Sequence, residues 1–502
     1  MSWTKFSRRF RALIRGEEAA KGRPLTFREF VQIANPRYRW AWHHELIASV
    51  FERLISGELR HPKSGKAIRR VFVFVPPRHG KPIWEEELVL MGDGTTKPLK
   101  EVRVGDEVVT AKGRPRKVLA VHVQGELPCI RMTTATGRKV TTEPTHAFLT
   151  PGGWKKAGEL SPGECLTVLQ GPTIGNDVTP AEAFRLAGYF VGDGACGKVS
   201  TTINAKITAL DTIEREDIVR CAEALGFEIG KPDKDAITLK GGVRDWLRET
   251  GLSGKGSREK RVPEFVKQGT PELIGHFLGA YFACDGSINR RTGARRDCCV
   301  ELYSVSGDLL ADVQDLLARI GVQSTIREKV ATRGTNFLPG ARYVSYRLSI
   351  TSRDDVARFA GRVPMFHSKK ATLDEWALPR QTFDSLYRPD EIVSIEDAGM
   401  LLCRCLTVKE DETFTAAGFV VHNSELISRL ASAYLVYRHP SKWVAIASYG
   451  AGLAQTLSRA ARMNYRTAGG ELSPDMRAVR QWATPEGGGL WCCGVGGEAT
   501  GK

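Results

Sequence analysis

Apolar and polar positions at the two ends of the sequence predict alternating helices and strands. Near the N-terminus, residues 5–20 and 40–58 carry apolar side chains at helical spacing, and residues 71–75 (VFVFV) form a continuous apolar run. Such a short run is typical of a buried strand in a parallel sheet. Near the C-terminus, an amphipathic pattern begins at residue 424, and residues 443–449 (WVAIASY) predict a second strand. Both ends therefore predict parts of an α/β domain.

The segment after the first predicted strand begins a phosphate-binding turn without completing it. Gly80 and Lys81 follow the strand, but Pro82 comes next. A P-loop needs Ser or Thr after the lysine, at the start of a helix whose N-terminal N–H groups hold phosphate. Joining Lys81 to Ser424 restores strand, turn and helix together as VPPRHGKSEL. The sequence therefore predicts one α/β unit divided by an insert of residues 82–423.

Joined in this way, residues 1–81 and 424–502 resemble the large subunits of phage terminases, the ATPase motors that package DNA. The resemblance implies that Gly80 and Lys81 bind the phosphates of ATP and that Ser424 binds the accompanying Mg²⁺. It also implies double-stranded DNA, ATP and other terminase or portal subunits as partners. The expected location is the cytoplasm of the host cell of a phage or prophage.

Two features depart from a complete packaging motor. Val75 stands where the general GxxxxGK[ST] pattern has its first glycine, although the variant PPRH before Gly80 is one that terminases show. No apolar strand ending in paired acidic residues follows Ser448, so the second Mg²⁺-binding motif and the nuclease domain of the family are missing from the sequence. We therefore expect ATP hydrolysis only after joining, and only if the missing part is supplied.

The end of the insert carries a reactive sequence. The side-chain amide of Asn423 can attack its own carbonyl, forming a succinimide and breaking the bond to Ser424. His422 can donate a proton or orient this amide, and Ser424 can act as the nucleophile that receives the upstream segment. His-Asn-Ser alone is usually a turn, but its position at the junction favours chemistry. It resembles the C-terminal junction of inteins, which implies autocatalytic protein splicing by a Hint domain.

Two further segments fit the same resemblance. Residues 89–94 through 104–109 resemble the opening β-hairpin of a Hint domain, and residues 137–150 resemble the intein motif that contains a catalytic histidine. The resemblance gives His146 the role of straining and protonating the upstream scissile amide. The family often has Thr three residues before this histidine, whereas Glu143 stands here. The alternative is a structural histidine at a turn.

The first residue of the insert requires an unusual first step. Most inteins begin with Cys or Ser, but Pro82 has neither a nucleophile nor an N–H group. Either splicing is inactive, or another group attacks the preceding amide. Cys405 resembles the internal nucleophile of class 3 inteins, although Phe148 and Val421 replace the Trp and Thr that usually accompany it. The alternative for Cys405 is a small buried apolar residue, and Cys403 is the nearest competing thiol.

An internal repeat lies within the insert. Residues 186–194 (LAGYFVGDG) and 278–286 (LGAYFACDG) share five of nine residues. Each is followed by a strand-like stretch and a helical stretch that ends in an apolar-Gly pair, at 225–226 and 320–321. The repeat resembles the LAGLIDADG homing endonucleases over roughly residues 180–350, which implies a DNA-cleaving hydrolase and intein homing.

The LAGLIDADG resemblance assigns roles to the repeated residues. Small side chains would let the two helices pack closely, and these are Ala187, Gly188, Gly279 and Ala280. Asp193 and Asp285 would then lie side by side and hold the Mg²⁺ that phosphodiester cleavage needs. Lys260 matches the lysine of the family before the second helix. The alternatives are aspartates that only cap helices, or a degenerate endonuclease kept as a scaffold.

Charged residues are unevenly distributed along the chain, and their distribution bears on whether the protein binds DNA. The net charge of +16 comes from the ends: residues 1–81 hold 18 basic and 6 acidic groups, and residues 424–502 hold 9 and 5. Excess positive charge of this kind is suited to binding DNA; the alternative is a solvated surface that serves only solubility. The insert has no net charge, but its arginines after the second repeat motif predict a basic loop for phosphate contacts: Arg290, Arg291, Arg295 and Arg296.

Length and composition narrow the class of protein. A chain of 502 residues is too long for one core, so two to four domains are expected. An apolar fraction of 42% and a charged fraction of 26% exclude collagen-like and largely disordered chains. No apolar run approaches the ~20 residues of a membrane helix, and no export signal is expected. Eleven scattered cysteines predict no disulfide framework and favour a reducing, intracellular setting without membrane partners.

The expected fold is a multidomain mosaic of α/β, all-β and α+β parts: an interrupted P-loop ATPase fragment, an all-β Hint domain and an inserted LAGLIDADG (DOD-type) endonuclease. The expected parts are residues 1–81, 82–178 (first Hint part), 179–360 (endonuclease), 361–423 (second Hint part) and 424–502. The expected function is a self-splicing terminase precursor with a homing endonuclease. The alternative is an ATP-driven packaging-motor fragment that carries an inert insert.

Overall fold

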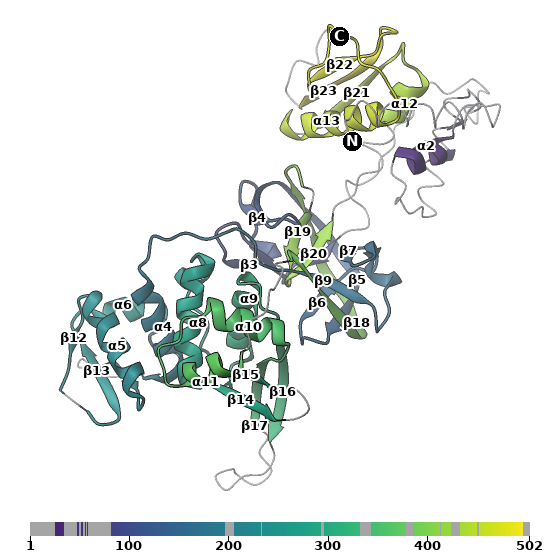
Figure 1. Cartoon of the computed structure of the whole chain (residues 1–502). Coiled ribbons are helices and arrows are strands. Elements are labelled where there is room, and N and C mark those ends of the chain that lie inside the picture. The colour runs from purple at the N-terminus through teal and green to yellow at the C-terminus, as the bar shows by residue number, and fades with distance from the viewer. Residues whose placement is uncertain are drawn as a thin grey trace. The chain divides into compact units, whose positions relative to one another are not determined.

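The computed structural model divides the chain into two compact units, one made of residues 1–79 and 424–502 and the other of residues 80–423 (Figure 1). It describes residues 26–34, 48–49, 52–53, 56, 58, 82–195, 205–231, 233–292, 296–331, 343–377, 385–411, 413–422, 432–448 and 451–494. The predicted helix at 5–20, the predicted strand at 71–75 and the predicted site residues Gly80, Lys81, Asn423 and Ser424 lie outside the described residues. No described helix has both the length and the apolar character needed to cross a membrane.

The unit formed by the two flanks is an α/β arrangement. Its elements are α2 (Phe27–Ala34), α12 (Ser432–Arg438), β21 (Trp443–Ser448), α13 (Ala451–Thr467), β22 (Gln481–Ala483) and β23 (Gly489–Gly494). The sheet has the order β21-β23-β22; β21 and β23 run parallel and β22 is antiparallel to β23. The strand predicted at 443–449 is confirmed as β21. Parallel pairing requires a crossover, and α13 supplies it between β21 and the strands that follow.

Side chains from both sides of the insert share one core in this unit. The rings of Phe27 and Phe30 in α2 lie 5.1 Å from the ring of Tyr434 in α12, and Phe30 lies 5.2 Å from Tyr437. Both phenylalanines are fully buried, and burial of each contributes about 2–3 kcal/mol. Residues from α2 and α12, on opposite sides of the insert, therefore stabilise the same domain.

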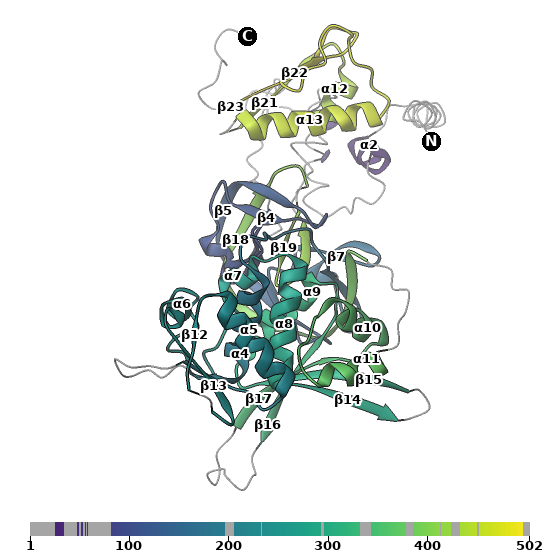
Figure 2. The same cartoon turned by 60° about the vertical axis from the view of Figure 1, so that its left-hand side comes forward.

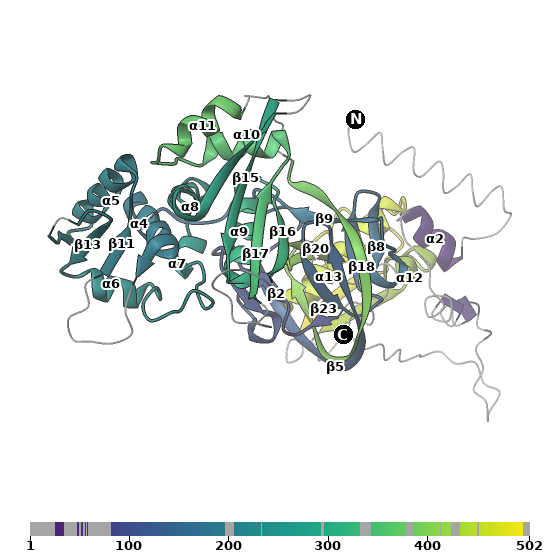
Figure 3. The same ribbon diagram turned by 90° about the horizontal axis from the view of Figure 1, so that it is seen from below.

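The β domain of the insert contains twelve of its strands. These are β1 (Ile83–Trp84), β2 (Leu88–Leu90), β3 (Thr96–Pro98), β4 (Glu107–Val109), β5 (Pro115–Thr134), β6 (Lys139–Thr142), β7 (Ala147–Thr150), β8 (Gly153–Lys156), β9 (Cys165–Leu169), β18 (Tyr387–Val408), β19 (Thr413–Ala416) and β20 (Phe419–His422). They follow the order β3-β2-β19-β20-β9-β18-β1-β6-β5-β4, with β7 pairing β20 and β8. Figures 1 and 3 show β5 and β18 as the longest strands of this domain.

The two halves of the β domain are joined by β18. Its first residues, Tyr387–Glu391, pair with β9, and the rest pairs with β5 over most of its length. Side chains from both halves fill one core, including the fully buried rings of Phe148, Phe414 and Phe419. The opening hairpin differs from the expected one. β2 turns into β3 at Gly94, whose φ of 91° favours glycine, while β4 pairs with β5 instead.

The repeat domain of the insert has two halves with the same order of elements (Figure 2). The first contains α4 (Ala181–Asp193), β10 (Gly194–Ala195), β11 (Ala205–Thr208), α5 (Thr212–Ala224), β12 (Glu228–Ile229), β13 (Ala236–Lys240), α6 (Val243–Glu249) and α7 (Glu264–Lys267). The second contains α8 (Pro271–Asp285), β14 (Gly286–Thr292), β15 (Arg296–Ser304), α9 (Gly307–Arg319), β16 (Thr325–Ala331), β17 (Tyr343–Ile350), α10 (Arg353–Arg362) and α11 (Lys369–Trp376). The sheets β10-β11-β13-β12 and β14-β15-β17-β16 have equivalent strand orders.

The internal repeat predicted from the sequence is confirmed in this domain. α5 and α9 end at the predicted apolar-Gly pairs, and Gly226 and Gly321 both have a φ of 74°, which only glycine adopts at little cost. The buried core of the repeat domain includes Leu373 and Ala377. The packed domain therefore extends beyond the expected boundary at residue 360.

The helix pair α4 and α8 packs closely through two of the predicted small residues, Gly188 and Ala280. A Cβ added at Gly188 would lie 2.5 Å from the carbonyl oxygen of Phe277 and 2.7 Å from the Cβ of Ala280. Glycine is therefore needed for this approach. The expected role of Gly279 in the same contact is wrong, because a Cβ there would meet the carbonyl oxygen of Pro364 instead.

Candidate functional site

The start of the insert is held inside the β domain. Pro82 is buried, and the following strand β1 pairs with β18 (Ile83 opposite Arg404) and with β6 (Ile83 opposite Thr142). The carbonyl oxygen of Pro82 accepts hydrogen bonds of 3.3 Å from the backbone N–H of Glu143 and from the hydroxyl of Thr142. Pro82, the first residue of the insert, therefore lies against the end of β6.

The end of the insert reaches the same short segment. His422, the last residue of β20, pairs with Ala147 at the start of β7. Its side chain lies outside the described residues, as do Asn423 and Ser424. Residues 142–147 thus contact both ends of the insert, which are separated by 340 positions in sequence. This segment contains His146.

The turn between β6 and β7 fixes His146 in the interior. His146 is fully buried, and its ring contacts Phe148 edge-on at 5.4 Å. Its backbone N–H donates to the carbonyl oxygen of Glu143 at 3.0 Å, and its own carbonyl accepts from Ala157 at 2.8 Å. Both bonds restrict the backbone on either side of the imidazole. His146 thus lies in the segment that contacts Pro82 and His422.

The residue that sequence reasoning missed here is Thr142. The carboxylate of Glu143, which stands where the family often has Thr, accepts from the backbone N–H and the hydroxyl of Thr145 and so stabilises the turn. The hydroxyl that approaches the junction belongs to Thr142, one position earlier. A threonine displaced by one residue from the expected position was the available signal.

The two candidate thiols lie on β18 and are both fully buried. Because Ile83 pairs with Arg404, the same antiparallel register places Pro82 in line with Cys405. Cys403 has a different environment: its Sγ lies 3.3 Å from the Sγ of Cys129, and burial raises the pKa of the Cys403 thiol well above its usual range. Because both thiols are buried, it is the register opposite Pro82 that distinguishes Cys405 from Cys403.

Charged groups near the upstream junction include one carboxyl with an altered pKa. Burial raises the pKa of Glu87 to about 7, against the lowering effects of a hydrogen bond from Thr141 and the charge of Arg131. The backbone N–H of Thr141, next to Thr142, donates to Glu87 Oε1 at 2.7 Å. A carboxyl that titrates near neutral pH therefore accepts a hydrogen bond from the residue just before the segment that contacts both ends of the insert.

The second site lies at the ends of the two repeated helices. Asp193 is the last residue of α4 and Asp285 the last of α8. The pKa of Asp285 is raised to about 6, first by desolvation and second by the charge of Asp193, while Lys260 and Lys369 lower it. Two carboxylates that repel each other in this way can share a divalent cation such as Mg²⁺, which prefers oxygen ligands.

Two lysines close the ends of these helices in equivalent positions. Lys260 Nζ donates to the carbonyl oxygens of Val191 (2.6 Å) and Gly192 (3.1 Å) in α4. Lys369 Nζ donates to the carbonyl oxygens of Ala283 (2.5 Å) and Cys284 (3.3 Å) in α8. Sequence reasoning found Lys260 and missed Lys369, because only the fold shows that the two are related. Both cations lie next to the carboxylate pair.

The basic residues expected in a loop after Asp285 belong instead to a hairpin. Arg290 and Arg291 lie in β14, which starts directly after Asp285, and pair with β15. Arg290 packs over the ring of Trp376 at 5.6 Å. Arg295 lies outside the described residues, as does the side chain of Arg296. Arg290 and Arg291 therefore place positive charge on the strand that starts directly after Asp285.

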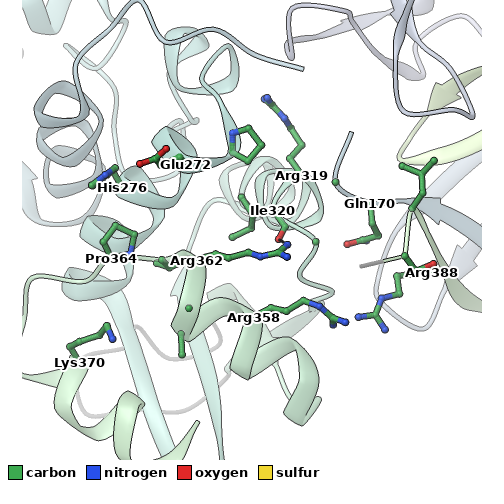
Figure 4. A pocket seen from close by; sticks show the side chains of 18 residues that line it. Gln170, Glu272, His276, Arg319, Ile320, Arg358, Arg362, Pro364, Lys370 and Arg388 are labelled. Atoms are coloured by element: carbon green, nitrogen blue, oxygen red, sulfur yellow. Dashed lines mark hydrogen bonds between the residues drawn. The ribbon is translucent and has the colours of Figure 1, made fainter. Parts of the chain in front are cut away.

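The cavity in Figure 4 belongs to the seam between the β domain and the repeat domain. It has a volume of about 910 Å³, and none of the predicted site residues lines it. Its cationic side chains have structural partners: Arg319 donates to the carbonyl oxygens of Ile174 and Gly269, and Arg358 and Arg388 both donate to Asp355. This cavity is therefore separate from both candidate sites.

Comparison with known families identifies one part of the chain. Residues 272–364 match the family model of the LAGLIDADG-like domain. The chain contains a LAGLIDADG-like domain. The matched segment starts in α8, and the repeat seen in sequence and fold relates it to the half that begins with α4.

Several curated proteins are similar to this chain. The replicative DNA helicase DnaB of Rhodothermus marinus is 28% identical over 302 residues, covering 55% of this chain and 31% of the helicase. Protein RecA of Mycobacterium tuberculosis (strain H37Rv) is 29% identical over 312 residues, covering 58% of this chain and 39% of RecA. An iron-sulfur cluster assembly SufBD family protein of Mycobacterium bovis is 26% identical over 283 residues, covering 48% and 32%. The chain spans about a third of the length of these relatives.

Solved structures with detectable similarity include two inteins. A DnaB intein from Synechocystis sp. PCC 6803 is 11% identical with a TM-score of 0.24, over 68% of this chain and 98% of the other. The gp41-1 intein is 24% identical with a TM-score of 0.17, over 17% of this chain and 67% of the intein. TM-scores of this size do not define a common fold.

Proposed function

We propose that residues 82–423 are an intein that removes itself from the chain and joins Lys81 to Ser424. The observation that carries the proposal is the segment 142–147. It bonds to Pro82 and pairs with His422, so one turn containing His146 contacts both ends of the insert. Reactions at two distant peptide bonds need this proximity before they can be coupled.

The proposed splicing steps use groups from this site. His146 assists attack on the Lys81–Pro82 amide, which has a smaller trans preference than other peptide bonds and is easier to distort. The thiol of Cys405 attacks the carbonyl of Lys81, forming a thioester while the Pro82 nitrogen leaves with a proton. The hydroxyl of Ser424 then takes over the acyl group as an ester.

The last steps separate the insert from the joined flanks. The side-chain amide of Asn423 attacks its own carbonyl, with His422 assisting, and the bond to Ser424 breaks as the succinimide forms. The freed amine of Ser424 displaces its own ester and leaves an ordinary peptide bond to Lys81. Each bond broken is matched by one formed, so splicing needs no cofactor.

The identities of the curated relatives support an insert that occurs in different hosts. A helicase, RecA and an iron-sulfur assembly protein differ in their named functions, yet each matches about half of this chain. The two flanks make up only about a third of the sequence, so every match must include part of residues 82–423. A segment common to unrelated proteins is expected of a mobile intein.

The repeat domain would act as the homing endonuclease of this intein. We propose that Asp193 and Asp285 hold Mg²⁺ and that Lys260 assists cleavage of double-stranded DNA at the uninterrupted codons for Gly-Lys-Ser. The LAGLIDADG-like match supports this assignment. The insert splits its own target, which would protect the gene that carries it.

The host of the intein would be the large subunit of a phage terminase. The shared aromatic core of the flanks and the parallel pairing of β21 with β23 support one interrupted α/β domain. Joining would bring Gly80, Lys81 and Ser424 into one P-loop for ATP and Mg²⁺. ATP use by the motor, together with other terminase or portal subunits, would follow only in the joined protein.

Expression of the whole chain tests this proposal. Intact-mass measurement should find a free protein of residues 82–423 and a ligated protein in which 1–81 is joined to 424–502. Cys405→Ala should stop upstream cleavage and ligation, whereas the matched control Cys403→Ala should still splice. A wild-type chain that stays at full length would instead support a motor fragment with an inert insert.

A further inference from the structure

A group of metal-binding side chains lies beside the carboxylate pair, and the proposed function uses only one of them. The carboxylates of Asp193 and Glu214 and the thiol of Cys284 come from α4, α5 and α8, and their ligand atoms all lie within 4.8 Å of one another. Cys284 Sγ is 3.5 Å from Glu214 Oε1. The group therefore offers one sulfur and two oxygen ligands at a single point.

Glu214 is the member that most needs explanation. The residue as a whole is only 4% exposed. Among the residues that the structure describes, its carboxylate has no hydrogen-bond partner outside this group. An acidic group buried in this way is costly unless cations or several donors compensate it. The charge of Lys369 acts on Glu214, but the Lys369 ammonium donates its hydrogen bonds to the carbonyl oxygens of Ala283 and Cys284. The carboxylate thus points toward Cys284 and Asp193 as though to a common ligand.

The equivalent positions in the other half of the repeat keep only one such ligand, Asp285, which corresponds to Asp193. Cys284 corresponds to Gly192 in the repeated motif, and Glu214 corresponds to Leu309, since each is the third residue after a helix N-cap. A Cβ added at Gly192 would lie 2.4 Å from the Cβ of Cys284. Glycine therefore makes the room that the thiol occupies. The group breaks the two-fold symmetry on one side only.

We propose that Asp193, Glu214 and Cys284 bind a divalent cation of the zinc class. In a tetrahedral zinc site, Zn–S of about 2.3 Å and Zn–O of about 2.1 Å place sulfur and oxygen about 3.6 Å apart. The distance between Cys284 Sγ and Glu214 Oε1 is 3.5 Å. A thiolate ligand favours zinc over Mg²⁺, which prefers oxygen. Three protein ligands leave the fourth position for water.

Such a site would interfere with the nuclease through Asp193. This consequence rests on the proposed function, in which Asp193 and Asp285 hold Mg²⁺ together. A zinc ion bound by Glu214 and Cys284 would take the carboxylate of Asp193 away from that pair. DNA cleavage would then fall as free zinc rises, while splicing would continue because it uses other residues.

Cobalt(II) substitution tests the site without depending on activity. Co²⁺ added to the purified chain should produce a thiolate-to-cobalt charge-transfer band that Zn²⁺ abolishes. Cys284→Ser should remove the band. Glu214→Gln should weaken Co²⁺ binding by roughly 10–100-fold or more, because loss of even an outer-shell contact has an effect of that size. The control Cys165→Ser, in β9, should leave the spectrum unchanged.

Each outcome decides between the proposals. A wild-type chain without the band, or a band that persists in Cys284→Ser, overturns the metal site even if Mg²⁺-dependent cleavage is found. A band that behaves as expected in a protein that cuts no DNA supports the metal site and counts against the nuclease. Loss of the band in Cys165→Ser would move the ligand to another thiol and also refute the assignment.

Discussion

The close contact between α4 and α8 makes Gly188→Ala an informative change. The new methyl group would lie 2.5 Å from the carbonyl oxygen of Phe277 and 2.7 Å from the Cβ of Ala280. A backbone oxygen cannot rotate away as a side chain can, so the two helices must separate by several tenths of an ångström. The helix ends that carry Asp193 and Asp285 would shift with them.

The expected loss follows from two opposing effects. Overpacking of a close contact costs about 1–3 kcal/mol, and the rigid backbone partner places this site at the upper end. Alanine has a better helix propensity than glycine by about 1 kcal/mol. The net destabilisation of the repeat domain should therefore be about 2 kcal/mol, a fall in Tm of roughly 4–8 °C at the 2–4 °C per kcal/mol of domains this size.

Gly361→Ala provides the matched control. Gly361 is also a helical glycine, in α10, but a Cβ added there would meet nothing within 4 Å. This change should stabilise the domain by about 0.5–1 kcal/mol. Thermal unfolding of both variants is measured in a Cys405→Ala, Asn423→Ala background, in which the proposed steps can break neither junction. DNA cleavage and splicing assays in the chain without these two changes complete the comparison. Cleavage should fall in Gly188→Ala while splicing persists.

The result that refutes the packing argument is specific. If Gly188→Ala unfolds at the same temperature as the parent and cuts DNA equally well, the helices do not approach as closely as the structure shows. If Gly361→Ala destabilises the domain as much as Gly188→Ala, the effect comes from helical glycines in general. The two variants together separate these explanations.

Three further predictions concern other parts of the site. The parent should lose up to about 3 kcal/mol of unfolding free energy as pH rises from about 4.5 through 7, because the buried Glu87 carboxyl must then lose its proton, and Glu87→Gln should not show this loss. Equal dependence of stability on pH in the two proteins from pH 5 to 8 would contradict this prediction. Thr142→Val should slow splicing about fivefold by removing a hydrogen bond worth about 1 kcal/mol, and an unchanged rate on a time-course gel would count against this contact. Asp193→Asn, or removal of Mg²⁺ by a chelator, should abolish DNA cleavage without slowing splicing, and joint loss of both activities would show that the sites are not independent.

The repeated helices were predictable because local patterns define them. Apolar residues at helical spacing, a terminal Asp-Gly pair and an apolar-Gly pair at the end of the next helix recur at both copies, and α4 and α8 follow these signals. The strand at 443–449 was equally clear from its continuous apolar run. Such features depend on neighbours in sequence.

The remaining features depend on register and tertiary contacts. The role of Thr142 follows from the pairing of β6 with β1, and no local pattern reports which strands pair. Lys369 and Glu214 reach the carboxylate pair only because α11 and α5 pack near the ends of α8 and α4. The sequence likewise placed the small residue Gly279 on a helix, but it did not show which neighbour this residue faces.

The peptide across the new junction gives the most direct test of the central claim that the insert excises itself. A glutamate-specific protease cuts after Glu58 and Glu425 and finds no other glutamate in residues 59–81. Tandem mass spectrometry of the expressed wild-type chain should therefore identify residues 59–81 joined directly to residues 424–425. Peptides that run continuously from Lys81 into Pro82, with none joining Lys81 to Ser424, would contradict the account.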